Sequence, residues 1–206
     1  MNAHRPRLLL ILLTIICLAG CSSKNTPSRC LLPQEARLQA GDVVFRRGCG
    51  FTSHAVLFAD RQGNYSHVGI VVDSCGTLLV VHAVPGEPDY EGDPDRVKAD
   101  TPQHFFSTEY TSIGEVRRPA DASVAAKAAQ VAWQVYQRHT LFDHDYDDAD
   151  TTRMYCTELV AFAFSRAGHD IVEGRRRHVN LPFIRHDCVF PSDVHASDFL
   201  TPIIIF

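Results

Sequence analysis

Two apolar runs near the middle of the chain constrain the fold more than any other feature. Residues 68–72 and 78–83 are rich in β-branched side chains, and the turn-forming segment 73–77 separates them. Two such runs joined by a short polar segment predict an antiparallel β-hairpin. The sequence therefore requires a sheet, to which the rest of the chain must attach.

The position of the turn decides which side chains face each other across this hairpin. A turn centred between Ser74 and Cys75 places His67 directly opposite His82, with their Cβ atoms about 5 Å apart. A turn centred one residue later places His67 opposite Val84 and His82 opposite Gly69. The first register is attractive because it pairs two imidazoles, but the sequence leaves both registers open.

Helices alternate with further strands along the chain, which favours the α+β class. Strands are expected at 43–45 and 113–117, a short helix at 52–60, and longer helices at 122–138 and 154–167. Asp121 is the expected cap of the first long helix, and Gly168 is the expected C-terminal stop of the second. Residues 85–104, rich in proline and charge, are expected to form a long surface loop, and the apolar tail 202–206 to dock on the core.

The first 20 residues have the pattern of a secretory signal. Arg5 and Arg7 precede the apolar run 8–18, which is shorter than the ~20 residues that span a bilayer. The ending Leu18-Ala19-Gly20-Cys21 resembles the bacterial lipobox, which implies a lipid on Cys21. We therefore expect a signal peptide at 1–20, a lipidated tether at 21–36 and one folded domain at 37–206. Ser22 favours the outer membrane facing the periplasm, so the expected partner is a membrane, held through the lipid.

Charge and length limit the remaining function classes. Without residues 1–20, which contain Arg5, Arg7 and no acidic residue, the formal net charge falls from −4 to −6. An acidic chain without a basic stripe argues against nucleic acid as a partner. A mature chain of this length buries one core, which favours a single domain.

Seven cysteines suggest a thiol chemistry rather than a metal site. Cys17 leaves with the signal and Cys21 takes the lipid, so Cys30, Cys49, Cys75, Cys156 and Cys188 remain. If Cys156 stays free, the other four allow three disulfide pairings, and the sequence does not choose among them. No Cys-x-x-Cys pair and no regular His spacing is present, and the acidic stretch 142–150 does not match a calcium-binding loop. We expect no metal and no cofactor.

Cys156 is the candidate nucleophile because it lies where a helix is expected to begin. Asp150, Thr151 or Thr152 could cap that helix. The positive end of the helix dipole favours a thiolate, the reactive form in acyl transfer. A cysteine on an apolar helix is more often a small buried side chain, so the position alone does not define a site. His67 is the candidate base, and His82 the candidate group that orients it.

Five segments, in order, resemble one known family. They are 41–45 (Gly-Asp-Val-Val-Phe), 65–70 (Tyr-Ser-His-Val-Gly-Ile), 80–83 (Val-Val-His-Ala), the stretch from 142 through 155–160 (Tyr-Cys-Thr-Glu-Leu-Val), and 191–193 (Pro-Ser-Asp). Together they resemble the permuted papain-like amidases of the YaeF/YiiX type, relatives of NlpC-type cell-wall peptidases and of lecithin–retinol acyltransferase. The likeness covers residues 38–200. In it His67 precedes Cys156, the reverse of the order in ordinary papain-like enzymes.

This resemblance implies a circularly permuted papain-like fold, an antiparallel sheet packed against helices with the catalytic cysteine at a helix N-terminus. It implies that Cys156 is the nucleophile, His67 the base and His82 the third polar group, which is Glu in many members. The oxyanion would be held by the backbone N–H of Cys156, with Tyr155 as a weaker candidate for contact with the oxyanion or substrate. The implied substrates are amides or esters of the envelope: peptidoglycan peptides, acylated amino acids or lipids.

Two other function classes stay open. A binding or scaffold lipoprotein could keep a papain-like frame in which Cys156 and His67 are inactive. A redox protein is a third class, and it would need a disulfide between Cys156 and a second thiol such as Cys188.

Overall fold

One mainly antiparallel sheet organises the molecule, shown by a computed structural model that describes residues 28–206 except 62, 148 and 180–186. Its strand order is β10-β5-β1-β2-β3-β4-β6-β7, and only β6 and β7 pair in parallel. The strands are β1 (Val43–Gly48), β2 (His67–Ser74), β3 (Thr77–Val84), β4 (Arg96–Asp100), β5 (Thr111–Pro119), β6 (Leu141–Phe142), β7 (Arg153–Met154) and β10 (Leu200–Ile205). A second small sheet pairs β8 (Arg177–His178) with β9 (Asp187–Cys188).

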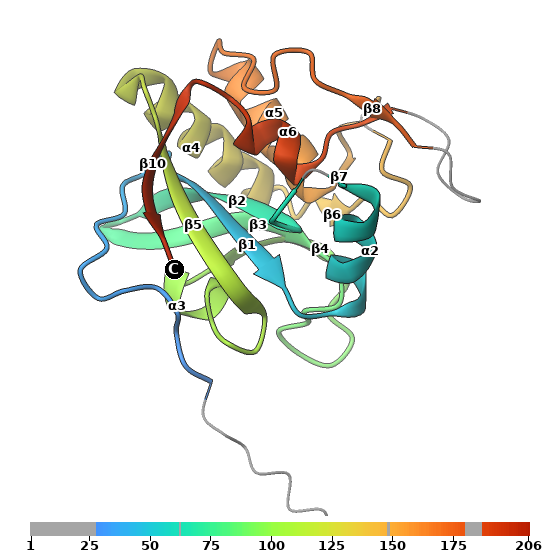
Figure 1. Ribbon diagram of the computed structural model, residues 1–206, viewed down its shortest axis with the longest axis horizontal. Coiled ribbons are helices and arrows are strands. Elements are labelled where there is room, and N and C mark those ends of the chain that lie inside the picture. Colours follow the sequence, from blue (N-terminus) through green and yellow to red (C-terminus); the bar gives the residue numbers. More distant parts are fainter. Residues whose placement is uncertain (1–27, 62, 148, 180–186) are drawn as a thin grey trace, which may run out of the picture.

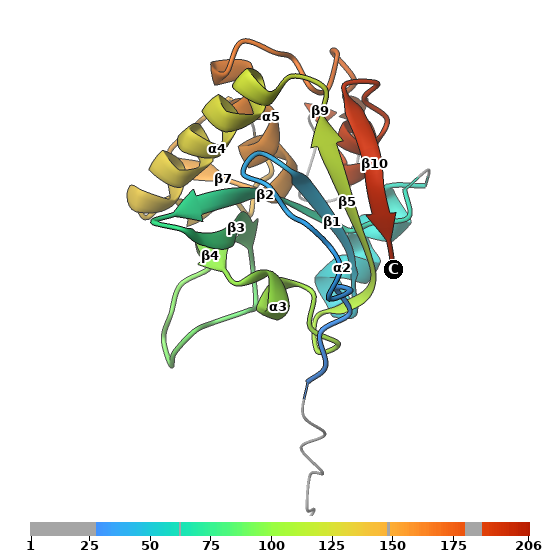
Figure 2. The ribbon, with the colours of Figure 1, turned by 90° about the vertical axis from the view of Figure 1, so that its left-hand side faces the viewer.

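Helices cover the sheet unequally. The two long helices, α4 (Ala122–Gln137) and α5 (Cys156–Arg166), pack together on one face, and the short α3 (Pro102–Phe105) lies on the other (Figures 1 and 2). Helix α2 (Phe51–Ala59) follows β1, and α6 (Pro191–His195) lies beside α5 (Figure 1). The α+β class is therefore confirmed, with the sheet between two unequal layers.

Alternation along the strands builds a separate core on each face of the sheet. Val68, Ile70 and Val72 of β2 belong to the core under α4 and α5. Val71 belongs to a smaller core on the other face, with Phe105 and Phe106. Since successive strand side chains point to opposite faces, His67 shares its face with Val71 and the α3 side.

The hairpin forms, but in the later of the two registers. Ile70 pairs with Val81 and Ser74 with Thr77, so the turn residues are Cys75 and Gly76. Both have positive φ, 54° and 85°, which is the geometry of a two-residue type I′ turn. Of the two registers that the sequence left open, the one with His67 directly opposite His82 is not formed, because the turn that matches the strand twist lies one residue further along.

The expected long loop at 85–104 is also wrong in its second half. Residues Arg96–Asp100 form β4, which pairs with β3 in the register His82↔Lys98, and α3 follows directly. Thr101 caps α3 by accepting a hydrogen bond from the His104 N–H. The charged residues of this strand are typical of a solvated loop in sequence. In the structure, however, Lys98 and Asp100 are buried among polar partners.

The two long helices form close to their expected positions. Asp121 caps α4 by accepting hydrogen bonds from the Ser123 and Val124 N–H groups. Helix α5 begins at Cys156 itself, two residues later than expected, and Gly168 follows its end with φ 95°. The expected caps at Asp150, Thr151 and Thr152 are wrong, because the N-cap is Tyr155, whose N–H donates to the Glu158 carboxylate.

The C-terminal tail is ordered by the sheet. Residues 200–205 pair with β5 as an edge strand, and Phe206 packs edge-on against Phe106 at 4.9 Å between ring centroids. At the other end of the described chain, Cys30 and Ser107 form an isolated antiparallel β-bridge. This backbone pairing attaches the start of the described chain to the α3 side. The expected signal peptide at 1–20 and the lipid site Cys21 lie outside the described residues. Among the described helices none is both long and apolar enough to cross a membrane.

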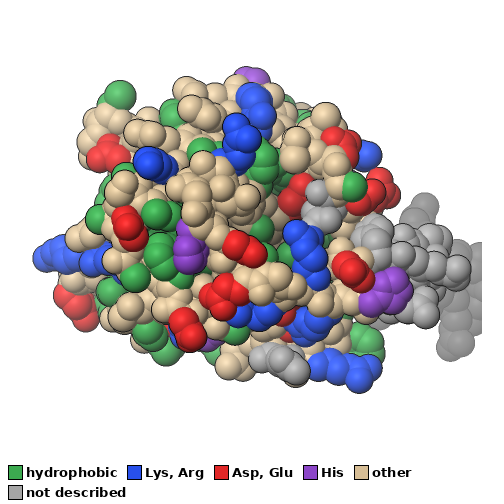
Figure 3. Space-filling view, turned by 90° about the horizontal axis from the view of Figure 1, so that it is seen from above, with side chains coloured by type: hydrophobic (Ala, Val, Ile, Leu, Met, Phe, Trp, Pro, Cys, Tyr) green, Lys and Arg blue, Asp and Glu red, His purple; other side chains and the backbone are tan. Residues whose placement is uncertain are grey.

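Two further features of the described domain are its surface charge and its cysteines. On the face shown in Figure 3, acidic and basic side chains are interspersed and no basic stripe runs across it. No disulfide links the cysteines of the described residues, which are Cys30, Cys49, Cys75, Cys156 and Cys188. The pairing left open by the sequence is not formed here, so the stability of the described domain depends on its two cores.

Candidate functional site

A row of three hydrogen-bonded side chains crosses β2, β3 and β4. Nε2 of His67 lies 2.8 Å from Nδ1 of His82, and Nε2 of His82 lies 3.0 Å from an Oδ atom of Asp100. All three side chains are at least nine-tenths buried. The predicted pair of histidines is therefore in contact, and Asp100 is a third member that was not expected from the sequence.

The carboxylate fixes the tautomers along this row. Asp100 accepts a hydrogen bond, so the neutral His82 ring carries its proton on Nε2 and presents Nδ1 as an acceptor. His67 must then donate from Nε2, which leaves its Nδ1 with a free lone pair. A neutral imidazole oriented in this way is a general base with one defined basic atom.

Gly69 explains how the two rings meet despite the shifted register. A Cβ atom on this residue would lie 2.7 Å from a Val80 methyl carbon and 3.1 Å from the Cβ of His82. The missing side chain opens space for His82 to lean along the sheet toward His67, so that the ring centroids are 5.0 Å apart. A diagonal contact of this kind lies within reach of aromatic side chains.

We expect Gly69→Ala to displace His82 and to lower the free energy of unfolding by about 1–3 kcal/mol, the usual cost of overpacking. Chemical denaturation of the purified variant measures the loss. Gly50→Ala is the matched control, since no atom lies within 4 Å of its Cβ position. Equal stability of the two variants would contradict a packing role for Gly69.

Burial sets the charge states of the row. Burial lowers the pKa of His67 well below its ordinary value, and the neighbouring Arg46 lowers it further. Burial also lowers the pKa of His82, against the opposing effect of Asp100. Burial opposes the ionisation of Asp100, yet the hydrogen bond from His82 and the nearby Lys98 charge lower its pKa to about 2. At neutral pH the row therefore consists of two neutral imidazoles and one carboxylate.

Cys156 is the first residue of α5 and lies beside the start of β2. The backbone N–H groups of Val68, Thr157 and Cys156 itself lie close enough to its sulfur to favour the thiolate. Val68 directly follows His67, so the thiol lies against the strand residue next to the candidate base. In the described part of the chain no hydrogen bond joins the sulfur to the imidazole, which is common for such pairs when no substrate is bound.

The thiol is not activated in the resting state. Burial raises the pKa of Cys156 to about 11, although the three N–H groups and the Arg46 charge favour the thiolate. A position at a helix N-terminus predicts a lowered pKa for this thiol. That expectation is wrong in direction, because desolvation of the sulfur outweighs the helix end.

We therefore expect iodoacetamide to modify Cys156 slowly at pH 7 and about tenfold faster for each pH unit up to about pH 10, because only the thiolate reacts. Peptide mass mapping over a pH series measures this rate, and the exposed Cys49 and Cys75 serve as internal controls. Rapid labelling of Cys156 below pH 8.5 that is lost in His67→Ala would instead show a preformed thiolate–imidazolium pair.

An apolar cavity of about 120 Å³ adjoins the thiol. Its lining combines Cys156 and Tyr155 of the α5 start with Val56 of α2, and Cys188 lies in the same wall. The Tyr155 hydroxyl accepts a hydrogen bond from the Val189 N–H, so this group holds the wall of the cavity. The thiol pair considered for a redox protein thus shares one cavity, whereas Cys30, Cys49 and Cys75 lie elsewhere.

A second cavity, of about 520 Å³, adjoins His67 and has a lining that is about half polar. Arg46 of β1 lines it, together with Ser66 just before β2, and Glu87 and Tyr110 line it from neighbouring loops. Thr52 and Val56 of α2 line both cavities. Helix α2 therefore spans the boundary between a thiol side and an imidazole side of one site.

The late Pro191-Ser192-Asp193 segment holds α2 in place rather than contributing to the chemistry. Asp60, at the end of α2, is fully buried and accepts hydrogen bonds from the Ser192 hydroxyl at 2.7 Å and N–H at 3.1 Å. The Arg177 guanidinium joins Asp60 to Asp193, and it lies over the Phe190 ring. This network ties one end of α2 to α6.

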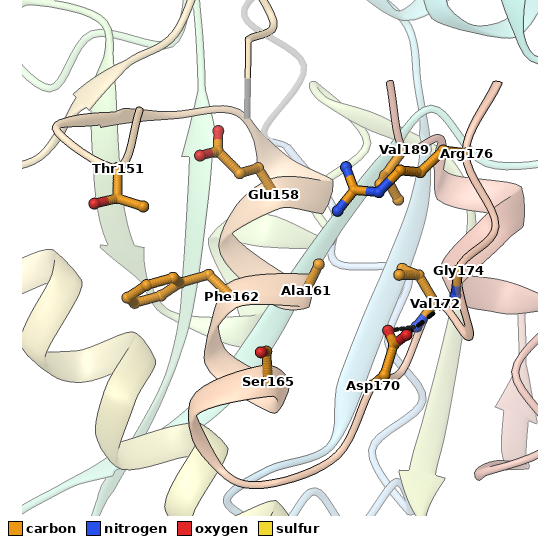
Figure 4. A pocket seen from close by; sticks show the side chains of 10 residues that line it. All are labelled: Thr151, Glu158, Ala161, Phe162, Ser165, Asp170, Val172, Gly174, Arg176 and Val189. Atoms are coloured by element: carbon orange, nitrogen blue, oxygen red, sulfur yellow. Dashed lines mark hydrogen bonds between the residues drawn. The ribbon is translucent and has the colours of Figure 1, made fainter. Parts of the chain in front are cut away.

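Glu158 lies on the far side of the α5 start, in a separate cavity of about 350 Å³ (Figure 4). One carboxylate oxygen accepts from the Tyr155 N–H at 3.2 Å, and the other is buried without a partner. Burial raises the pKa of Glu158 to about 8, and the nearby charges of Asp143, Asp150 and Asp147 add to the shift. The side chain is therefore mostly protonated at neutral pH.

We expect Glu158→Gln to be more stable than the native chain at high pH. The native carboxyl loses its proton near pH 4.3 when unfolded but near pH 8 when folded, so its contribution to stability falls between these values. The stability difference between variant and native chain should therefore grow from pH 5 to pH 8 and then level off. Thermal unfolding across this range measures it. A constant difference would contradict the raised pKa.

The acidic loop between β6 and β7 is partly structural. Asp143 is buried, and its carboxylate accepts hydrogen bonds from the Asp145 and Asp147 N–H groups. The carboxylate of Asp143 therefore shapes the loop instead of being solvated. Within the described residues no cluster of three or more His, Cys, Asp or Glu side chains is arranged to hold a metal ion.

Two functional candidates, Asp100 and Arg46, were not expected from the sequence. Asp100 lies in the segment expected to be a loop, although the alternation of Val97 and Ala99 with Lys98 and Asp100 is a strand signal. Arg46 is 2% exposed and contributes to the charge environment of both His67 and Cys156. No local signal marks a buried arginine, because it depends on partners far along the chain.

Comparison with known proteins supports the fold. The structure is similar to the crystal structure of the metalloprotein YiiX from Escherichia coli O157:H7, with a TM-score of 0.64 and 20% sequence identity. The match covers 82% of this chain and 98% of that one. No protein-family model matches the sequence, and no curated protein matches it. The chain thus has a YiiX-like fold, as the sequence segments suggested.

Proposed function

We propose that this chain is an envelope-anchored cysteine hydrolase of permuted papain-like fold that cleaves an amide or ester bond. The observation that carries the proposal is the buried row His67–His82–Asp100, which leaves Nδ1 of His67 as its one free basic atom. That row ends beside Val68, against which the Cys156 thiol lies. A nucleophile, a base and an orienting group in this relation are the parts of a thiol acyl-transfer site.

The proposed reaction has two steps. Nδ1 of His67 takes the thiol proton as the Cys156 sulfur attacks the substrate carbonyl, and the same proton passes to the leaving amine or alcohol as its bond to the carbonyl carbon breaks. A thioester on Cys156 and a free amine or alcohol result. Water, deprotonated by His67, then attacks the thioester, releasing the carboxylic acid and restoring the thiol.

The resting charges suit proton transfer during attack. A thiol with a pKa of about 11 and an imidazole with a lowered pKa both stay neutral at pH 7. Attack on a carbonyl creates negative charge on its oxygen, which the Cys156 backbone N–H can hold at the start of α5. The charge of Asp100, transmitted through His82, stabilises the imidazolium that forms at His67.

Detection of the thioester is the direct test. The protein is incubated with cell-wall fragments and with N-acyl and ester lipids, and intact-mass spectrometry follows the chain. A mass increase equal to one acyl group, absent in Cys156→Ala, supports the proposal. Turnover that persists in Cys156→Ala would refute a cysteine nucleophile.

A binding or scaffold module is the second candidate, favoured by the raised pKa of the resting thiol. It predicts that these donors bind without any adduct or released acid, and that Cys156→Ala binds as well as the native chain. Equilibrium binding measured beside the adduct experiment separates the two.

A further inference from the structure

The two sides of the proposed site differ in polarity. The cavity next to Cys156 is lined mainly by apolar atoms, with Val56, Ala59 and Val189 among its walls. The cavity next to His67 contains Arg46, Glu87 and Glu109 instead. A substrate that lies across the boundary therefore has one apolar half and one polar half.

The Arg46–Glu87 ion pair is the fixed polar element of the His67 side. One terminal nitrogen of Arg46 donates to the Phe105 carbonyl at 3.0 Å, another pairs with a Glu87 oxygen, and the guanidinium lies 4.6 Å from the centre of the Phe105 ring. The backbone of Glu87 is held in turn by Lys98, whose ammonium donates to its carbonyl at 2.8 Å. Both side chains are thus pre-positioned.

This ion pair leaves one donor and one acceptor unused. Nε of Arg46 and Oε2 of Glu87 are buried and have no hydrogen-bond partner. Buried polar atoms nearly always find partners, and each unsatisfied one costs about 1–3 kcal/mol. The pair is neutral as a whole, so its complement is a neutral group that both accepts and donates. A secondary amide meets these requirements.

We infer that the leaving half of the substrate is a peptide, an inference that rests on the hydrolase proposed above. A backbone carbonyl of this peptide accepts from Nε of Arg46, and an N–H donates to Oε2 of Glu87. The acyl half lies in the apolar cavity beside Cys156. The substrate class is therefore an N-acylated peptide, and the bond cleaved joins the acyl group to the peptide nitrogen. Arg46 and Glu87 both line the cavity next to His67, so a peptide in that cavity lies against the two side chains that carry these atoms.

Three matched compounds test this inference. N-octanoylglycine methylamide has the leaving-half amide, N-octanoylglycine methyl ester lacks its N–H, and N-octanoylbutylamine lacks both polar groups. Release of octanoate gives kcat/KM for each. We expect the methylamide to exceed the methyl ester by at least about tenfold, because a site built for a hydrogen-bond donor discriminates against its absence. Equal values for amide and ester would overturn the inference.

Variants show whether Glu87 causes the preference. In Glu87→Gln an N–H group can replace the acceptor, so we expect the amide-to-ester ratio to fall to about threefold or less. Glu91→Gln, on the exposed part of the same loop, should keep the native ratio. An unchanged ratio in Glu87→Gln would also overturn the inference, and the ratio is insensitive to a general loss of folded protein.

Binding separates this inference from the proposed function. Calorimetric titration of Cys156→Ala with the three compounds needs no catalysis. If the native chain releases no octanoate but the variant binds the methylamide at least about tenfold more tightly than the ester, the peptide subsite stands and the hydrolase proposal fails. Equal affinities for amide and ester, or no binding of any compound, overturn the subsite.

Discussion

His67→Ala is expected to lower kcat by about 10³-fold, near the middle of the range for loss of a general base. The thiol of Cys156 has a pKa of about 11, so without the base only a small thiolate fraction remains at pH 7. The residual rate of the variant should therefore rise about tenfold for each pH unit between 7 and 10. The native rate should be nearly constant there, because the lowered pKa of His67 keeps its imidazole neutral throughout.

Hydrolysis of the best substrate across pH 6–10 measures both effects. His144→Ala is the matched control, since this histidine is well exposed and pairs with Asp95 rather than with a member of the row. The unfolding midpoint of each variant shows whether the fold is retained. Parallel pH profiles for His67→Ala and the native chain would contradict a base function for His67.

Asp100→Asn should cost about 10²-fold or more in kcat, although the two side chains have almost the same shape. The asparagine amide can donate to Nε2 of His82, which moves the His82 proton to Nδ1. His67 then accepts at Nε2 and carries its own proton on Nδ1, so the free lone pair proposed to take the thiol proton is lost. The variant also loses the negative charge that stabilises the imidazolium.

This prediction can be checked on the tautomers as well as on the rate. Nitrogen-15 spectra of the histidine rings report which nitrogen carries each proton, and we expect the His67 pattern to reverse in Asp100→Asn. Asp198→Asn, at an exposed position, should change neither the rate nor the spectra. If Asp100→Asn turns over the substrate at the native rate, Asp100 has no function in the proposed site.

The sequence predicted the strands and helices that follow a simple apolar period. The hairpin at β2 and β3, helix α4 with its Asp121 cap, and helix α5 with Cys156 at its start all depend on local patterns. The register of the hairpin was not predicted, since Cys75 adopts a positive φ that non-glycine residues seldom show. A shift of one residue at that turn changed every pair along the two strands.

The candidate site was predicted in part. Cys156, His67 and His82 were named from their positions, and the two histidines are in contact by a diagonal path that depends on Gly69. Asp100 and Arg46 were missed, because their burial results from pairing with distant residues rather than from their own neighbours in sequence. The pKa of the thiol was misjudged for a related reason: a helix end is visible in sequence, but the depth of burial is not.

The backbone β-bridge between Cys30 and Ser107 limits how far the domain can lie from a membrane anchor at Cys21. Cys30 lies nine positions after Cys21, and a fully extended chain over those nine steps reaches at most about 32 Å. With the proposed lipid on Cys21, the α3 side of the domain would stay within roughly that distance of the bilayer. Substrates further from the bilayer would then have to diffuse to the membrane surface. Inserting residues between Cys21 and Cys30 would lengthen the tether and increase the distance from the bilayer at which the domain could reach its substrates.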